Sequence, residues 1–116
     1  MSRFMLLFRA NPESYQSMSP EDMQQTVKKW MDWRADMEKS GHVVQYGERM
    51  EHTGKVIRGK SKTVTDGPYV EVKDFIQGSA LIKARDIDEA VSIANGCPIL
   101  DSNGSVEIRP IYNSQD

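Results

Sequence analysis

Two helix-start signals, each preceded by a β-prone run, constrain the fold of this chain most strongly. Ser19 is placed as an N-cap before Pro20 and two acidic residues, and proline and negative charge both favour the first turn of a helix. Residues 86–89, Asp-Ile-Asp-Glu, repeat the capping pattern. The apolar residues 4–8 precede the first helix, and the β-prone residues 75–84 precede the second. The sequence therefore predicts two strand-helix-strand units.

Both predicted helices have an apolar face at helical spacing, and each ends near a glycine, Gly41 or Gly96. Such a face packs on a sheet. The predicted packing residues are Met23, Val27, Trp30, Trp33 and Met37 in the first helix and Ile87, Ala90, Val91 and Ala94 in the second.

The remaining β-prone segments complete a sheet and add a hairpin. Residues 43–46 and 105–112 read as strands, and residues 75–84 place Ile76, Gly78, Ala80, Ile82 and Ala84 on one side. The pieces 55–58 and 62–65 flank a glycine-containing loop and read as a hairpin. The predicted fold is a ferredoxin-like α+β domain over residues 1–116, with a mostly antiparallel sheet, two helices on one face and an extra hairpin.

One face of such a sheet is left bare. A domain of this size rarely exposes a large apolar surface without a partner. We therefore expect a homodimer joined through the sheet faces, with a pocket between or within the subunits that occurs twice.

Composition narrows the function classes. The net charge is −2 and the pI is near 5.7, with basic residues scattered among acids, which argues against nucleic acid binding. No apolar run is long enough to span a membrane, and the first residues lack signal-peptide features. The only cysteine is Cys97, which fits a reducing compartment. We expect a cytoplasmic protein.

The segment 66–74 supplies most of the candidate site. Asp66-Gly67-Pro68 predicts a sharp turn after a strand. In an extended continuation Tyr69, Glu71 and Lys73 share one face and the two valines between them share the other. That face binds a ligand in one interpretation and is the solvated side of an edge strand in the other.

Glu107 and Arg109 share a face of the final strand and join this set. Arg109 offers a planar fork for a carboxylate, and a desolvated Glu71 would serve as a base. The competing interpretation makes Asp66 a turn residue and pairs Glu71 with Lys73 and Glu107 with Arg109. The predicted ligand-binding residues are Asp66, Tyr69, Glu71, Lys73, Glu107 and Arg109.

Other chemistry-bearing residues have structural explanations that compete with function. His42 follows a helix end, and His52 lies in a polar loop. Glu48, Glu51 and His52 have no matching cluster of metal ligands, so we expect no metal and no cofactor. We assign Cys97, near a helix end, to a packing role. The two tryptophans are also assigned to packing.

A family resemblance is carried by residues 4–7, 62–69, 86–90 and 104–110, together with Glu71, Lys73 and Gly78. These segments together resemble the YCII-related superfamily and, within it, the branch named for its Asp-Gly-Pro-Phe (DGPF) motif. Tyr69 stands where that branch usually has Phe, so its hydroxyl needs water or an acceptor. The resemblance spans nearly the whole chain and implies a ferredoxin-like fold that dimerises through its sheets.

The resemblance also implies a His-Asp acid-base dyad in some members, and this chain departs from it. The His position falls at Asp22 or Met23, and the Asp position falls at Cys97, just before Pro98. Without the imidazole, the group best suited to proton transfer near neutral pH is missing. The dyad mechanism does not carry over.

Two functions remain open from the sequence. The first is a small-molecule site for an anionic or aromatic metabolite, in a binding protein or an unassigned enzyme. The second is a non-catalytic interaction module, because the resemblance to the DGPF branch implies a link to alternative sigma factors. We favour the first, because the motif charges on one strand face are hard to explain by folding alone.

Overall fold

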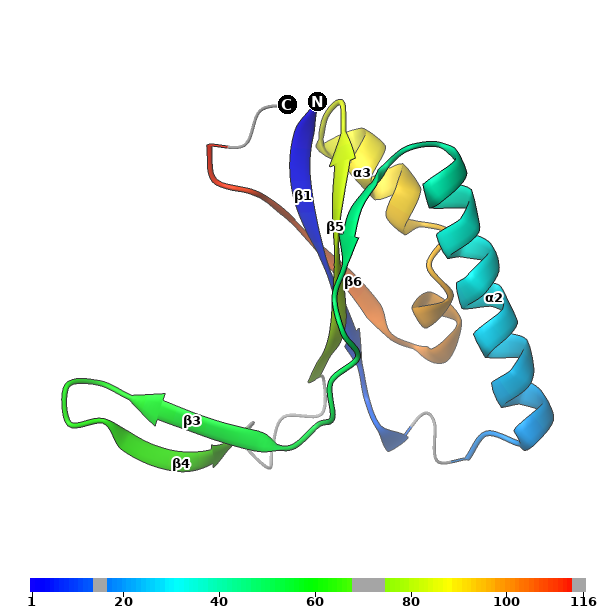
Figure 1. Ribbon diagram of the computed structural model, residues 1–116. Coiled ribbons are helices and arrows are strands. Elements are labelled where there is room, and N and C mark those ends of the chain that lie inside the picture. Colours follow the sequence, from blue (N-terminus) through cyan, green and yellow to red (C-terminus); the bar gives the residue numbers. More distant parts are fainter. Residues whose placement is uncertain (14–16, 68–74, 114–116) are drawn as a thin grey trace.

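A computed structural model describes residues 1–13, 17–67 and 75–113 (Figure 1). The elements follow in the order β1 (Ser2–Ala10), α2 (Pro20–Lys39), β2 (Val43–Tyr46), β3 (Gly54–Arg58), β4 (Thr63–Gly67), β5 (Phe75–Ala84), α3 (Ile87–Ala94), the short 3-10 helix η1 (Pro98–Ser102) and β6 (Ser105–Pro110).

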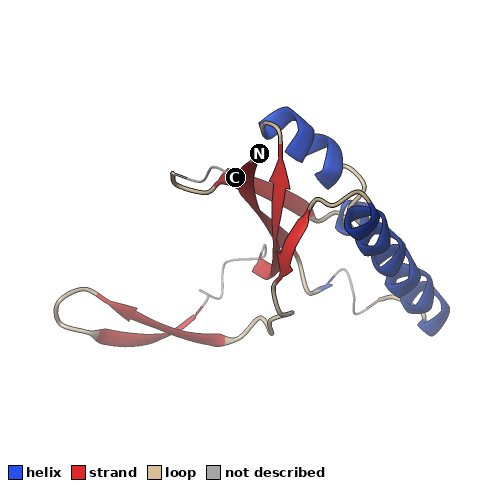
Figure 2. Ribbon diagram, turned by 45° about the horizontal axis from the view of Figure 1, so that its top comes forward, coloured by secondary structure: helices blue, strands red, loops and turns tan. Residues whose placement is uncertain are grey.

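Four strands form one antiparallel sheet in the order β2-β5-β1-β6, and β3 pairs with β4 in a separate two-stranded sheet. Both helices lie on the same face of this sheet (Figures 1 and 2). On the central strand β1, Phe4, Leu6 and Phe8 are buried, while the residues between them are half-buried on the opposite face. The predicted ferredoxin-like α+β class is confirmed, including the two helices on one side.

Aromatic side chains join the helices to the sheet. Phe8, Trp30 and Trp33 contact one another edge to face, with ring centroids 5.2 to 5.8 Å apart, a geometry that the ring quadrupoles favour. Trp33 also donates from Nε1 to the carbonyl oxygen of Ile93 at 3.0 Å, which fastens α2 to α3. The tryptophans therefore belong to the packing of the core, as the sequence predicts.

Both helix starts lie at the predicted residues. Ser19 caps α2 by accepting a hydrogen bond from the amide of Asp22 at 3.1 Å. Asp86 caps α3 by accepting from the amide of Glu89 at 2.8 Å. Beyond the end of α2, Gly41 adopts a φ of 77°, which glycine tolerates without strain.

The predicted buried faces of the helices are wrong at their edges. Val27 is 53% exposed, because Trp33 and Met37 centre the buried face roughly a quarter turn away around α2. In α3 the small side chains of Ala90 and Ala94 meet the core instead. Ile87 and Val91, at the margin of that face, are 45% and 42% exposed.

The predicted alternation in β5 also fails at its beginning. A bulge lies between Phe8 and Arg9, so Arg9 pairs with Ile76 whereas Phe8 pairs with Gly78. Ile76 is consequently 36% exposed and does not join the buried series of Gly78, Ala80 and the residues that follow. A bulge of this kind has no signature in the apolar pattern.

The predicted hairpin is present and extends away from the sheet as an arm, defined as residues 54–67 (Figures 1 and 2). The radius of gyration of the chain is 15.9 Å, compared with about 13 Å for a compact domain of roughly this length. The arm explains that excess. The strand predicted to continue through residues 69–73 lies outside the described residues.

Within the part of the chain that the structure describes, no helix is long and apolar enough to cross a membrane.

Candidate functional site

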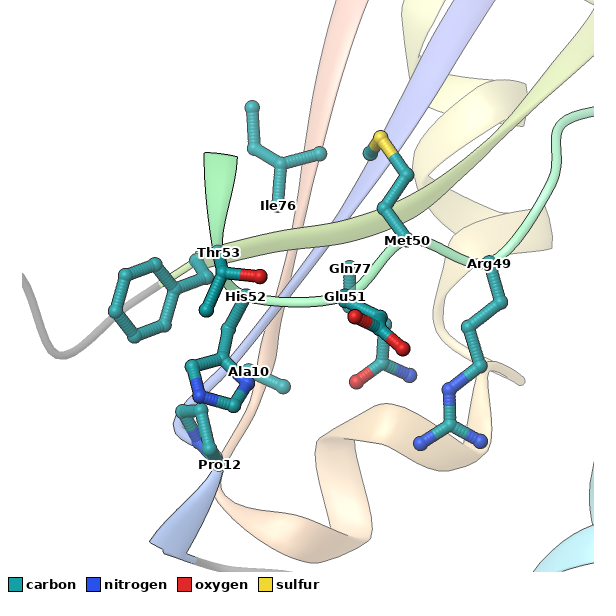
Figure 3. A pocket seen from close by; sticks show the side chains of 10 residues that line it. Ala10, Pro12, Arg49, Met50, Glu51, His52, Thr53, Ile76 and Gln77 are labelled. Atoms are coloured by element: carbon teal, nitrogen blue, oxygen red, sulfur yellow. The ribbon is translucent and has the colours of Figure 1, made fainter. Parts of the chain in front are cut away.

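A cavity of about 660 Å³ lies where β1 ends, β5 begins and the arm leaves the sheet (Figure 3). Three separate segments build it: the end of β1, residues 49–53 before the arm, and the start of β5. The lining residues are Ala10, Pro12, Arg49, Met50, Glu51, His52, Thr53, Phe75, Ile76 and Gln77.

The segment after β2 is held along β5 by two backbone hydrogen bonds. The amide of Gly47 donates to Ser79 O at 2.8 Å, and the amide of Met50 donates to Gln77 O at 2.7 Å. A Cβ at Gly47 would clash with Ser79 Oγ and lie 3.0 Å from Ser79 O, so a larger residue would require Ser79 to shift and the segment to move away from β5. Gly47 thereby fixes one wall of the cavity.

The cavity combines a polar group of side chains with an aromatic pair. Arg49, Glu51 and Gln77 extend to one side of the 49–53 segment, whereas Met50 and Ile76 extend to the other (Figure 3). Within the described residues, no hydrogen bond or ion pair engages the side chains of Glu51 and Gln77. These two side chains can therefore accept or donate hydrogen bonds to a bound molecule.

The aromatic pair is His52 and Phe75, whose ring centroids lie 6.0 Å apart with the ring planes tilted by 49°. The sequence places His52 in a polar loop without assigning it to a site, and the structure shows that its ring lies beside that of Phe75. An apolar or aromatic ligand body has a surface to contact here.

The predicted site residues that the structure describes lie elsewhere. Asp66 is on β4, where its 86% exposed carboxylate pairs with Lys55. Glu107 accepts a hydrogen bond from Arg9 Nε at 3.0 Å and lies 3.8 Å from Arg109 NH1, so Glu107 and Arg109 are close together on β6. None of the three lines the cavity.

Tyr69, Glu71 and Lys73 lie outside the described residues, and their ligand-binding role stays a prediction. Sequence reasoning did not assign Arg49, Glu51 or Gln77 to a site. The available signal was the polar run after Gly47, but that run meets β5 only in the folded chain.

A smaller groove of about 200 Å³ lies between α2 and η1. Asp22 lines it beside Pro98, and Lys29 forms an exposed ion pair there with Asp101 at 3.4 Å. This is the region in which the family resemblance would place a His-Asp dyad. Cys97, next to Pro98, is 2% exposed, and burial raises the pKa of its thiol to about 12. It is therefore protonated near neutral pH and unsuited to proton transfer.

Within the described residues, no group of three or more His, Cys, Asp or Glu side chains is arranged to hold a metal ion. A comparison with curated proteins gave no match. The family description YCII-related domain matches residues 2–115, which is nearly the whole chain. The chain therefore belongs to the YCII-related family.

Proposed function

We propose that this protein binds a small carboxylate-bearing metabolite in the cavity at the base of the arm. The observation that carries the proposal is the cavity itself. Its volume of about 660 Å³ falls within the range of small-molecule sites, and a guanidinium, a carboxylate, an amide and an aromatic pair all line it.

Each part of the lining suits a part of such a ligand. The planar guanidinium of Arg49 matches a carboxylate in a two-bond geometry. His52 and Phe75 offer ring surface to an apolar or aromatic body. Glu51 and Gln77 accept from a hydroxyl or amino group. The favoured ligand class is an aromatic or apolar carboxylate that also carries a hydrogen-bond donor.

A calorimetric screen tests this proposal. The panel pairs aromatic and aliphatic carboxylates with their neutral amides, and we expect a carboxylate to bind and its amide to bind at least tenfold more weakly. Arg49→Gln should weaken binding by a similar factor, because it removes the charge but keeps a polar side chain.

Arg109→Gln is the matched control, since it makes the same change on β6, away from the cavity. Equal affinities of wild type and Arg109→Gln support the cavity. A loss of binding confined to Arg109→Gln would move the site to the sheet face that the sequence predicts, and a panel without any binder would reject the proposal.

We also infer a homodimer joined through the sheet face that the helices leave open. Met5, Leu7 and Leu81 lie half-buried on that face, on two adjacent strands. A small apolar centre of this kind is typical of a surface that another chain covers. Light scattering coupled to size exclusion measures the mass directly, and a monomer at all accessible concentrations would contradict this inference.

One observation favours the second candidate function, a protein-interaction module. Ile57 and Val64 lie opposite each other on the arm and are 68% and 58% exposed, so they form an apolar pair that a partner could cover. A link to alternative sigma factors, like membership of the DGPF branch, stays a hypothesis. A pull-down with purified sigma factors encoded near the gene tests it, and a clean result would count against it.

A further inference from the structure

We propose that the arm of one copy packs against the body of a second copy, so that two arms clasp the dimer. This inference rests on the homodimer proposed above and adds the element that holds it together. The arm leaves the base of the sheet and extends to the side opposite the helices, which is the side of the open sheet face (Figures 1 and 2).

The arm is poorly supported by its own chain. Among the described residues, its two strands pair only with each other. An isolated two-stranded hairpin is marginally stable in water, because it buries little apolar surface on either face. A surface provided by another copy would supply that burial.

One face of the arm carries exposed apolar side chains that a partner could bury. Ile57 and Val64 are directly opposite in the register and form an exposed apolar pair. Lys55 and Asp66, also opposite each other, form an ion pair on the same face. A β-branched cross-strand pair contributes most when a further layer packs on it.

Charge favours the body of a second copy over another arm. The arm holds Lys55, Arg58, Lys60 and Lys62 against the single acid Asp66, a net charge of +3. Because the whole chain carries −2, the remainder carries −5. The open sheet face itself is basic, with Arg3, Arg9, Lys83 and Arg109 against Glu107, so the acids that attract the arm lie elsewhere on the partner's body. Like charges keep two arms apart.

The arm also has the required reach. Each of its strands has five residues, which span about 17 Å in extended form. Packed sheets lie about 10 Å apart. An arm that starts at the edge of one sheet can therefore cross the gap to a facing sheet and contact the partner's side.

Photo-crosslinking between copies tests the contact. A benzophenone amino acid at Val64 probes the proposed contact face, and the same probe at Thr65 reports the opposite face of the same strand. In a mixture of ¹⁵N-labelled and unlabelled chains, we expect peptides that join the two isotopes from Val64 and not from Thr65. Crosslinks confined to one chain would overturn the inference.

The dissociation constant of the dimer gives a second measurement. Ile57→Ser with Val64→Ser should raise it at least tenfold, whereas Met31→Ser, at a 65% exposed apolar site on α2, should change it less than twofold. Lys60→Glu with Lys62→Glu keeps the apolar pair and reverses the arm's charge, so it should weaken the dimer mainly at low salt.

The outcomes separate this inference from the homodimer. A monomeric wild type overturns both. A dimer whose dissociation constant is unchanged by the arm variants, with no crosslink between copies, overturns the clasp alone. If the wild type binds duplex DNA and the Lys60→Glu, Lys62→Glu variant does not, the basic arm binds a polyanion. That result would also overturn the clasp.

Discussion

Cys97 shows how one buried residue can exclude a mechanism and also set a pH dependence. Its thiol is buried beside α3 and η1, and burial raises its pKa to about 12. In the unfolded chain a thiol has a pKa of about 8.5. Above that pH the unfolded state loses the proton while the folded state keeps it, so alkali favours unfolding.

We therefore expect the free energy of unfolding to be fully retained below pH 8 and to fall between about pH 9 and 12, by at most about 1.4 kcal/mol per pH unit. Urea denaturation at pH 7.5, 9 and 10.5 measures the decrease. Cys97→Ala should remove this part of the pH dependence. An identical slope in wild type and variant would show that other groups cause it.

Gly104 illustrates a position where side-chain size decides stability. A Cβ there would lie 2.7 Å from Arg9 O and 2.7 Å from Ile99 O, and backbone atoms cannot move aside cheaply. Overpacking of this kind costs about 1 to 3 kcal/mol, so Gly104→Ala should lower the free energy of unfolding by about that amount.

Gly54→Ala is the matched control for Gly104→Ala. Its Cβ would meet only Gly67 O, at an ordinary contact distance of 3.6 Å. Equal stability losses in the two variants, measured by urea denaturation, would contradict the steric explanation.

Helix starts could be predicted from the sequence to the residue, because a cap is a local contact between neighbours in the chain. Ser19 and Asp86 accept from amides three residues later, and no distant segment takes part. The margins of the helix faces could not be predicted, because packing against the sheet decides them. Val27 and Val91 fit the helical period and yet lie beyond the contact area.

The cap of α3 makes a prediction for the element as a whole. This helix has only eight residues, too few to be stable alone, so its first turn depends on Asp86. Asp86→Ala should cost about 1 kcal/mol of stability.

Asp88→Ala is the control for Asp86→Ala, since it removes the same charge within the first turn but not the cap. Chemical denaturation should give a smaller loss for it. If both variants lose the same stability, charge near the helix N-terminus and not the hydrogen bond to Glu89 accounts for the effect.

At the scale of the whole molecule, the cavity could not be predicted even though the strands around it could. Its walls come from residues 10–12, 49–53 and 75–77, which meet only after β1 and β5 pair. The sequence instead pointed to the charged residues of segment 66–74. Of these, the structure describes Asp66, which pairs with Lys55 on the arm.

The arm and the body should behave as separable parts of the molecule. In the described part of the chain, β3 and β4 pair with each other and not with the four-stranded sheet, and the core residues lie in the body. Replacing residues 55–66 by a short Gly-Ser linker should therefore leave a cooperative thermal transition within a few degrees of wild type. The same variant should dissociate to monomers at higher concentrations than wild type, because it lacks the clasp. Differential scanning calorimetry and sedimentation velocity measure the two effects independently, and loss of the cooperative transition would show that the body depends on the arm for its fold.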